Sequence, residues 1–339
     1  MKSVSVYDAV GMVLCHDVTR IVPGRCKGPA FRKGHIITDQ DVRPLLDMGK
    51  ANVYVYDLAE GYIHEDDAAT RIASAAAGPG LHLTSPSEGR VNLTASLNGL
   101  LKVNPAALKQ INCVEDVVFA TLHSNLPVRA NQPVGGTRIT PLVTRSENVQ
   151  RAESICREQA PVIQVKALRS MQVGIVTTGS EVFHGRIEDQ FGPVLHAKFA
   201  ELGCPVLGQV FVSDDAAMTA QAIRTFIDKG AEMVAVTGGM SVDPDDRTPA
   251  AIRDTGARVV TYGAPVFPGA MFMLAYLGEV PIIGLPGCVM YHRTSIFDLI
   301  VPRILAGEDL TRGDFIELGY GGYCSACATC TYPRCGFGK

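Results

Sequence analysis

The chain reads EMVAVTGGMSVDPDDRTP at residues 232–249, where an apolar segment runs into a pair of glycines and then into an acidic loop. The apolar part, Met-Val-Ala-Val, is typical of a short strand buried on both faces of a parallel sheet. Gly238 and Gly239 have no Cβ, so the backbone can turn sharply and bring its N–H groups close to a phosphate. Thr237 precedes this turn, and the Ser241 hydroxyl follows it. We therefore expect an anion-binding turn at the carboxyl end of the strand.

Three carboxylates follow the turn, at Asp243, Asp245 and Asp246. They place negative charge where a phosphate would also lie, which is favourable only when a cation neutralises it. Mg²⁺ is the natural candidate. The same residues could instead form an ordinary polar turn that begins a helix at Thr248 and Pro249, because proline suits the first helical turn. The stretch alone leaves both interpretations open.

Two further apolar segments end in turns of the same kind, VGIVTTGSE from Val173 and PIIGLPGC from Pro281. Right-handed crossovers bring the carboxyl ends of successive parallel strands to the same edge of a sheet. We therefore expect the three turns to converge on one ligand. The candidate binding residues in these two turns are Thr177, Thr178, Gly179, Ser180, Pro286 and Gly287.

These motifs resemble the molybdopterin-binding domain shared by molybdopterin adenylyltransferases and molybdopterin molybdenumtransferases. Within residues 172–306, the segments TTGSE, GRIEDQ, TGGMSVDPDDRTP, FPG and GLPG occur in the order of that family. The resemblance implies a three-layer α/β/α domain with a mostly parallel sheet. It also implies binding of molybdopterin, or its adenylylated form, with Mg²⁺ and with molybdate or ATP as second substrate. A dimer or trimer is expected, with a molybdoenzyme as recipient.

The resemblance assigns roles to individual residues. Asp189 in the GRIEDQ segment and Asp246 after the glycine pair match the family's essential carboxylates, so both are expected to be catalytic and to bind Mg²⁺. Pro268 and Gly269 match the start of the family's PGKP loop and are expected to contact the cofactor.

Several side chains of the family pattern are absent. Ala270 replaces the lysine of the PGKP loop, Asp243 occupies the last glycine position of GGxSxGxxD, and Phe191 replaces an asparagine. The DRTP ending is closer to the adenylyltransferase branch, so adenylyl transfer and molybdate insertion both stay open. The sequence keeps the glycine turns of the family pattern but lacks these side chains, so it is expected to keep binding more readily than turnover. A non-catalytic carrier or sensor of molybdopterin is therefore the alternative. Related domains in competence-damage-type proteins leave nucleotide processing as a third possibility.

Four of the ten cysteines, Cys324, Cys327, Cys330 and Cys335, follow one another with C-x2-C-x2-C-x4-C spacing. Thiolates this close can ligate one Zn²⁺ or one [4Fe-4S] cluster. Three evenly spaced cysteines resemble a cluster-binding run, whereas compact zinc sites more often use two separated pairs, so the spacing does not name the metal. A disulfide-bonded tail is the alternative. Cys288, in the GLPG turn, is a further candidate ligand.

Composition excludes some classes of partner. The net charge of −3 provides no positive field for nucleic acid. No apolar stretch is long enough to span a bilayer, and residues 1–20 lack a basic segment followed by an apolar one. We therefore expect a cytoplasmic protein with neither a nucleic acid nor a membrane as partner.

The pattern along the chain predicts four parts. They are a small α+β domain at 1–78, a β-rich domain at 81–165, the molybdopterin-binding domain at 166–310 and the four-cysteine tail at 311–339. The first part should contain a strand over 10–18 and a helix that Thr38 caps and Gly49 ends. The second should contain short strands and one helix, at 105–111. In the third, strands alternate with helices, the last helix running over 290–305.

Overall fold

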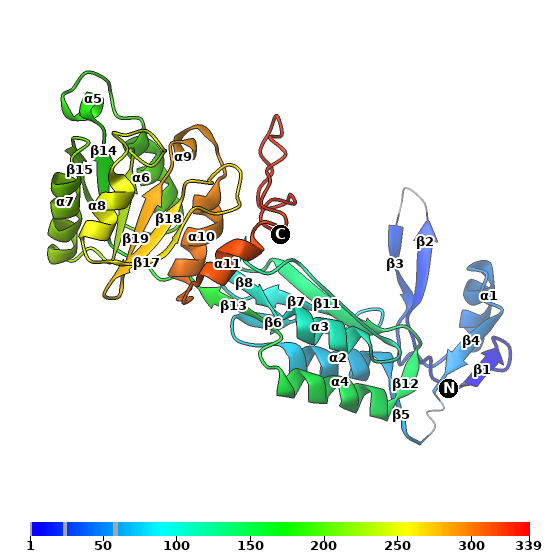
Figure 1. Cartoon of the computed structure of the whole chain (residues 1–339). Coiled ribbons are helices and arrows are strands. Elements are labelled where there is room, and N and C mark those ends of the chain that lie inside the picture. The colour runs from blue at the N-terminus through cyan, green and yellow to red at the C-terminus, as the bar shows by residue number, and fades with distance from the viewer. Residues whose placement is uncertain (1, 23–25, 57–59) are drawn as a thin grey trace. The chain divides into compact units, whose positions relative to one another are not determined.

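The computed structural model describes residues 2–22, 26–56 and 60–339 (Figure 1). Its contacts group the chain into two compact units. The amino-terminal unit contains residues 1–97, 101–122 and 128–165, and the carboxyl-terminal unit contains residues 98–100, 123–127 and 166–339. Each unit is described by itself.

The carboxyl-terminal unit is built on one six-stranded sheet. In sheet order the strands are β15 (Val206–Val212), β14 (Val173–Thr178), β16 (Met233–Thr237), β19 (Val280–Leu285), β18 (Met273–Leu277) and β17 (Arg258–Tyr262). The first four are parallel to one another, whereas β18 runs antiparallel to both of its neighbours. Every residue of β14 and β16 is buried, because helices cover both faces of a parallel sheet. The mostly parallel sheet is therefore confirmed.

Helices form the outer layers of this unit. They are α5 (Ser180–Phe183), α6 (Phe191–Glu201), α7 (Ala216–Asp228), α8 (Thr248–Asp254), α9 (Cys288–Tyr291), α10 (Ile296–Leu305) and α11 (Arg312–Glu317). Successive strand residues point to opposite faces. Ile175 packs in a cluster with Phe297 of α10, and Val176 packs in another with Phe226 of α7. These two cores make the predicted α/β/α sandwich.

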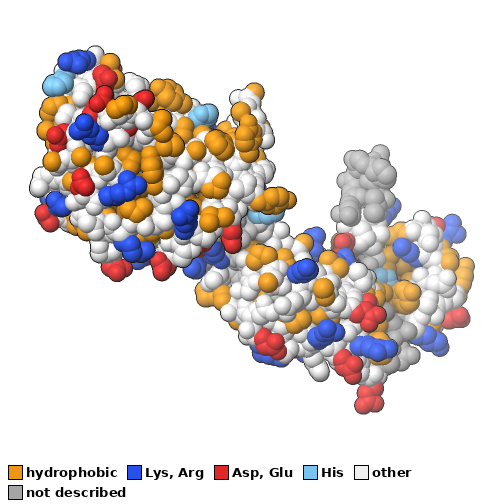
Figure 2. All heavy atoms as spheres, viewed as in Figure 1, with side chains coloured by type: hydrophobic (Ala, Val, Ile, Leu, Met, Phe, Trp, Pro, Cys, Tyr) orange, Lys and Arg blue, Asp and Glu red, His pale blue; other side chains and the backbone are white. Residues whose placement is uncertain are grey.

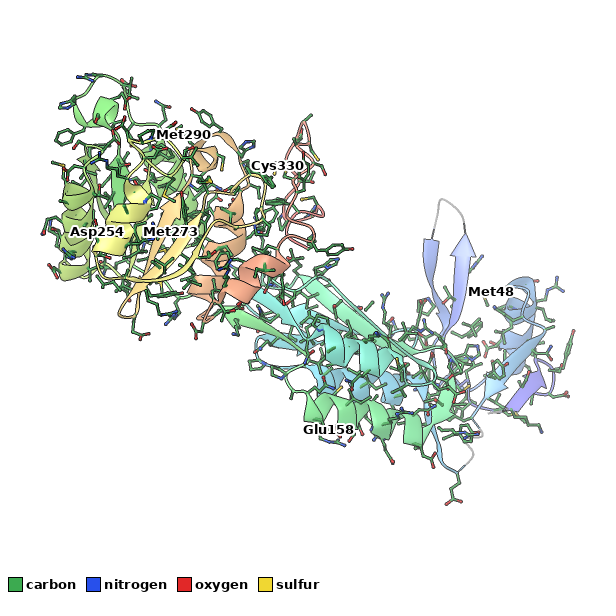
Figure 3. All side chains as sticks on the ribbon, in the orientation of Figure 1. Met48, Glu158, Asp254, Met273, Met290 and Cys330 are labelled. Carbon is green, nitrogen blue, oxygen red and sulfur yellow. The ribbon has the colours of Figure 1, made fainter. Side chains whose placement is uncertain are left out.

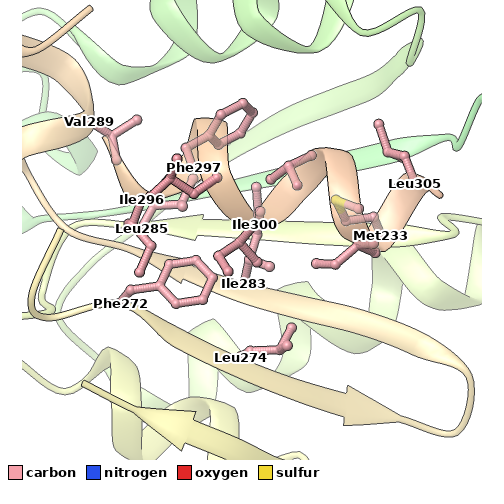
Figure 4. Packing of buried hydrophobic residues seen from close by; sticks show 14 of the residues in the cluster. Met233, Phe272, Leu274, Ile283, Leu285, Val289, Ile296, Phe297, Ile300 and Leu305 are labelled. Atoms are coloured by element: carbon pink, nitrogen blue, oxygen red, sulfur yellow. The ribbon is translucent and has the colours of Figure 1, made fainter. Parts of the chain in front are cut away.

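The larger core lies under α10. Figure 4 shows Ile296, Phe297 and Ile300 of this helix beside Ile283 and Leu285 of the sheet. All five side chains are at most 1% exposed. The predicted single helix over 290–305 is wrong in one respect, because the chain is extended or bent between α9 and α10. The two helices therefore leave a short loop at 292–295 at the carboxyl edge of the sheet.

In the described part of residues 2–55, two pairs of strands accompany one helix. Strands β1 (Lys2–Ser5) and β4 (Asn52–Val55) pair antiparallel, as do β2 (Val18–Val22) and β3 (Cys26–Phe31). Helix α1 (Asp39–Asp47) begins after a Thr38 capping box and ends before Gly49, as predicted. The predicted strand over 10–18 is wrong, since this segment contains turns and two isolated bridges, at Val13 and Leu14.

Helices α2 (Glu65–Ala76), α3 (Pro105–Asn112) and α4 (Ser146–Glu158) share one core with the sheet β6-β7-β11-β9. The strands are β6 (Leu81–Leu83), β7 (Arg90–Ala95), β11 (Pro133–Ile139) and β9 (Val117–Thr121). Two smaller sheets contain the remaining strands. In one, β5 (Tyr62–His64) pairs with β12 (Val143–Arg145). The other has the strand order β10 (Leu126–Val128), β8 (Gly99–Val103) and β13 (Ile163–Ala167).

Helix α4 was missed from the sequence. Its buried residues Val149, Ala152 and Cys156 are mostly small and are separated by charged side chains, so the apolar stripe is weak. Helix α2 lies in the first predicted part but packs against α4 and β11, which lie in the second. The four-part division itself stays a prediction.

A polar cluster in the amino-terminal unit links the end of β3 to the start of α2. His64 is 2% exposed, and its Nδ1 accepts hydrogen bonds from Lys33 Nζ (2.9 Å) and from the Asp66 backbone N–H (3.2 Å). Lys33 also pairs with the Asp66 carboxylate at 2.6 Å. Burial lowers the pKa of His64, so the ring is neutral and its Nε2–H donates to the Cys15 carbonyl. The cluster therefore has a structural role in capping α2.

Candidate functional site

The order of the strands locates a switch point between β14 and β16. From β14 the chain crosses through α6 to β15 on one side, and from β15 it crosses through α7 to β16 on the other side. In open α/β sheets such a reversal opens a crevice at the carboxyl ends of the two strands, where ligands bind. In this unit the switch point lies beside the TTGSE and TGG turns.

The strand register confirms that the predicted turns converge. Thr177, at the end of β14, pairs with Thr237, at the end of β16, and Thr237 pairs with Leu285, at the end of β19. The antiparallel strand β18 starts at this same edge, because Met273 pairs with Gly284. The turns that contain Gly179, Gly238, Pro286 and Gly269 therefore all lie along one edge of the sheet.

A chain of hydrogen bonds links Asp189 to this edge. Gln209, on β15, donates through Nε2 to Asp189 Oδ2 (2.6 Å) and to Thr177 Oγ1 (2.8 Å). Thr237 Oγ1 in turn donates to Thr177 Oγ1 at 3.4 Å. Asp189 and the TGG turn are thus connected through side chains of β15, β14 and β16.

Asp189 also caps the helix that follows it. Its Oδ1 accepts the N–H of Phe191 and its Oδ2 accepts the N–H of Gly192, both at 2.9 Å. With Gln209, three donors occupy the two carboxylate oxygens, which satisfies N–H groups that the first turn of a helix leaves open. The structure therefore gives Asp189 a positioning role that the sequence did not reveal, and its Mg²⁺ role stays a prediction.

A second set of hydrogen bonds fixes the glycine pair. Thr248, at the start of α8, donates to the Gly238 carbonyl at 2.8 Å, and its Oγ1 lies 3.2 Å from Thr178 Oγ1. Because the Thr248 proton is used on Gly238, the Thr178 hydroxyl is the donor of that second bond. Gly238 and Gly239 have φ of +83° and +56°. A Cβ on Gly238 would lie 2.2 Å from the Thr178 carbonyl oxygen, so only glycine fits this turn.

The turn presents backbone donors. Within residues 60–339, the N–H groups of Gly238, Gly239 and Met240 have no hydrogen-bond acceptor. Thr237 is fully buried, whereas the two glycines are partly accessible. Successive free N–H groups in a left-handed turn form a concavity that suits an anion.

The acidic loop lies next to this turn. Ser241, Asp243 and Asp245 are exposed, whereas Asp246 is half-buried. In the part of the chain that the structure describes, the Asp246 carboxylate accepts no hydrogen bond and joins no ion pair. Burial raises the pKa of Tyr262; the positive charge of Arg253 lowers it, and the negative charge of Asp246 raises it. Asp243 and Asp245 likewise have no side-chain partner among the described residues, and Asp246 differs from them in being half-buried.

The loop at 267–269 is held at the same edge. The Pro268 carbonyl accepts the N–H of Ile296, and Gly269 has φ of +136°. A Cβ on Gly269 would lie 2.5 Å from the Ile296 side chain, so glycine allows the loop to approach α10 closely. Gly287 is exposed, and Cys288 beside it is half-buried, which raises the pKa of its thiol.

The cysteine tail folds back on the carboxyl-terminal unit. Cys324 and Cys335 are half-buried against the larger core, and Cys327 and Cys330 are exposed. Cys330 Sγ lies 3.3 Å from Thr294 Oγ1, and this hydrogen bond lowers the pKa of the thiol. Figure 3 labels Cys330 on this tail and Met290 in α9. Among the described residues no group of three or more His, Cys, Asp or Glu side chains is placed to hold a metal ion.

Sequence reasoning missed Gln209, Thr248 and Tyr262 as parts of the site. Gln209 is the one amide in the otherwise apolar strand VLGQVFV, and this interruption is the signal that could have identified it. The sequence indicates only the start of a helix at Thr248. The residues around Tyr262 contain no motif that indicates a binding site, although its hydroxyl donates to the Met240 carbonyl at 3.2 Å.

The surface agrees with the charge balance of the sequence. Figure 2 shows Lys and Arg side chains interspersed with Asp and Glu side chains on the visible face. None of the helices described in the structure is long and apolar enough to cross a membrane.

Two families match parts of the chain. Residues 174–306 match the family described as "Probable molybdopterin binding domain", and residues 3–57 match a family described as a domain of unknown function. Residues 174–306 are thus a molybdopterin-binding domain of the molybdenum cofactor biosynthesis family.

Curated relatives match over limited lengths. The chain is 24% identical over 225 residues to the molybdopterin molybdenumtransferase of Synechococcus elongatus, covering 61% of this chain and 56% of that protein. It is 31% identical over 91 residues to the molybdenum cofactor biosynthesis bifunctional protein of the same organism, covering 27% of this chain and 28% of that protein. A CinA-like protein of Mycolicibacterium vanbaalenii is 36% identical over 80 residues, which cover 23% of this chain and 19% of that protein. The chain therefore spans from about a fifth to just over half of these relatives.

Among solved structures, the chain is similar to a molybdopterin biosynthesis enzyme from Thermus thermophilus. The TM-score is 0.34 at 21% sequence identity, and the match covers 41% of this chain and 98% of that chain.

Proposed function

We propose that the domain at 174–306 binds molybdopterin at the carboxyl edge of β14, β16 and β19 and acts in a transfer step on that molecule. The observation that carries the proposal is the convergence of the glycine turns at the switch point of the sheet, within the residues that match the family. The unpaired N–H groups of Gly238 and Gly239 would hold the phosphate of the pterin. The exposed Ser241 hydroxyl and the half-buried Ser180 would position its other oxygens.

The carboxylates of this edge fit a hard cation such as Mg²⁺, which prefers oxygen ligands and binds through one or two carboxylates plus substrate phosphates. Asp246 is the residue that would hold it, since its carboxylate has no partner among the described residues and is the one of the three loop carboxylates that is half-buried beside the glycine turn. When bound, Mg²⁺ would neutralise the charge of the phosphate beside the acidic loop. Asp189 would act through Gln209 and Thr177, by keeping the TTGSE turn in register with the TGG turn.

Two transfer reactions suit a phosphate held at this turn. In one, the pterin phosphate attacks the α-phosphorus of ATP, so that AMP is transferred and pyrophosphate leaves. In the other, molybdate is inserted at the dithiolene sulfurs, and hydrolysis of the bond between AMP and the pterin phosphate releases AMP. The DRTP ending at 246–249 favours the first. A carrier without turnover is the second candidate function, because Ala270 stands where the family pattern has a lysine. A homo-oligomer and a molybdoenzyme recipient stay predictions.

Binding and turnover can be measured separately. Purified protein is titrated with molybdopterin, followed by pterin fluorescence, with and without Mg²⁺, and then supplied with ATP or molybdate while AMP transfer and AMP release are recorded. Binding with neither reaction would favour the carrier, and no binding at any Mg²⁺ concentration would reject the proposal.

Asp246→Asn tests the cation role. We expect this variant to lose the dependence of pterin binding on Mg²⁺, because the amide keeps the shape of the side chain but removes its charge. Asp254→Asn is the matched control, since Asp254 is an exposed carboxylate at the other end of α8. An Asp246→Asn variant with the wild-type Mg²⁺ dependence would show that this carboxylate does not hold the cation.

A further inference from the structure

The last residues of the chain form a closed loop. The Gly338 N–H donates to the Gly321 carbonyl at 2.9 Å, and the carboxyl-terminal backbone approaches Gly321 so closely that a Cβ there would lie 2.0 Å from the Lys339 oxygen. Phe337 is 3% exposed in the larger core of the unit. The base of the loop is therefore fixed, while residues 324–339 contain no helix and no strand.

The four tail cysteines all lie inside this closed loop. Cys324 and Cys335 are half-buried against the core, whereas Cys327 and Cys330 are exposed. All four are free thiols. This irregular loop packs two large side chains on the core, the buried Phe337 and the half-buried Tyr332. So short a segment gains little from packing, and a metal is a common source of the missing stability in such segments.

The loop is attached to two of the loops at the carboxyl edge of the sheet. The Phe267 N–H donates to the Gly322 carbonyl and the Cys324 N–H donates to the Phe267 carbonyl, both at 2.8 Å, so the start of the tail pairs with the residue before Pro268. Further along, Cys330 contacts Thr294. Tyr332 completes this second attachment, because its hydroxyl donates to the Asp298 carbonyl at 3.1 Å.

We propose that Cys324, Cys327, Cys330 and Cys335 together ligate one thiolate-bound metal centre, and that the ligated loop braces the edge loops at 267–269 and 292–295. A Zn²⁺ ion or an iron-sulfur cluster satisfies this thiolate set. The Thr294 hydroxyl would then donate to a ligating sulfur, which is the kind of outer hydrogen bond that orients metal ligands. That these edge loops serve pterin binding rests on the proposed function, whereas metal binding and bracing do not.

Metal content tests the first part. The full chain is purified without oxygen, and zinc, iron and acid-labile sulfide are measured per chain for wild type, Cys327→Ser and Cys113→Ser. Cys113 is an exposed free cysteine outside the tail, so it controls for adventitious thiol binding. We expect one zinc, or iron with a matching amount of sulfide, in wild type and in Cys113→Ser, and its loss in Cys327→Ser. Equal metal content in all three proteins, or none in wild type after Zn²⁺ addition, overturns the site.

Hydrogen exchange tests the bracing. Backbone exchange at residues 265–270 and 292–298 is compared between the metal-loaded protein and the same protein after chelation. We expect about tenfold faster exchange in both segments without the metal. Without it the tail would be less ordered, and its hydrogen bonds to Phe267 and Thr294 would open more often. Exchange in α2 of the amino-terminal unit should not change. Unchanged exchange at both edge loops in a protein that binds metal would overturn the bracing and leave an isolated metal site.

Discussion

Replacing Thr248 with Val should loosen the glycine turn while keeping the shape of the side chain. Thr248 is 2% exposed, and its hydroxyl both donates to the Gly238 carbonyl at 2.8 Å and accepts from Thr178 at 3.2 Å. The substitution removes both hydrogen bonds and leaves the Gly238 carbonyl and the Thr178 hydroxyl without this partner. Gly238 is partly accessible, so the larger cost falls on the buried Thr178 hydroxyl. A buried polar group left unsatisfied costs about 1–3 kcal/mol, so we expect the carboxyl-terminal unit to lose roughly 2 kcal/mol of stability.

The matched variant is Thr248→Ser, which keeps the hydroxyl and removes one buried methyl, a loss of about 1 kcal/mol. Because the chain has no tryptophan, unfolding by urea is followed by circular dichroism. Pterin affinity separates the two variants more sharply. We expect Thr248→Val to bind at least about tenfold more weakly than wild type, a change of about 1.4 kcal/mol, and Thr248→Ser to bind nearly as well. If Thr248→Val binds pterin as tightly as Thr248→Ser, the hydroxyl does not position the turn and the reasoning is refuted.

Two further predictions concern the turn and the stability of the unit. Gly239→Ala places a Cβ 2.8 Å from Thr248 Oγ1, so we expect it to weaken pterin binding at least about tenfold. The control is Gly256→Ala, where φ is +83° and the space around the new Cβ is open, so this variant should lose only about 1–2 kcal/mol of stability. Equal pterin affinities of the two variants would contradict the prediction. Burial raises the pKa of Asp314, but hydrogen bonds from Thr311 and the Arg303 ion pair outweigh it and hold this pKa at about 2, below the usual 3.8. Because this pKa is lowered by folding, the ionised carboxylate stabilises the fold fully above pH 3.8, and this contribution is lost as the pH falls through about 2. We therefore expect Asp314→Asn to cost about 2 kcal/mol of stability at pH 7 and much less at pH 2. The same difference in urea midpoint between variant and wild type at both pH values would count against this.

The sheet of the carboxyl-terminal unit was predictable from the sequence because its strands are buried on both faces. Such strands appear as continuous apolar runs, and the polar turn after each run marks the carboxyl end. Thr177, Thr237 and Gly287 were placed at one edge on this basis, and the strand register confirms the placement. The segment over 10–18 failed because its alternating pattern belongs to turns and bridges rather than to a strand.

The connections within the site were not predictable, because they join residues that are distant in the sequence. Asp189 meets Gln209 across 20 positions, and Thr178 meets Thr248 across 70. A hydroxyl at the end of a strand indicates a polar edge, but its partner depends on the order of strands in the sheet. The attachment of the cysteine tail to Phe267 and Thr294 likewise depends on the folded path of the chain.

The buried hydroxyls at this edge connect the glycine turn to the strands around it. Thr177, Thr178, Thr237 and Thr248 are each at most 5% exposed, at positions where valine would fill the same volume without a polar atom to satisfy. Packing alone therefore does not require threonine. The hydroxyls instead bond to one another and to the Gly238 carbonyl, so the orientation of the glycine turn is tied to three elements at once. An anion that binds such a preorganised turn need not order the backbone, which leaves more of the interaction energy for affinity.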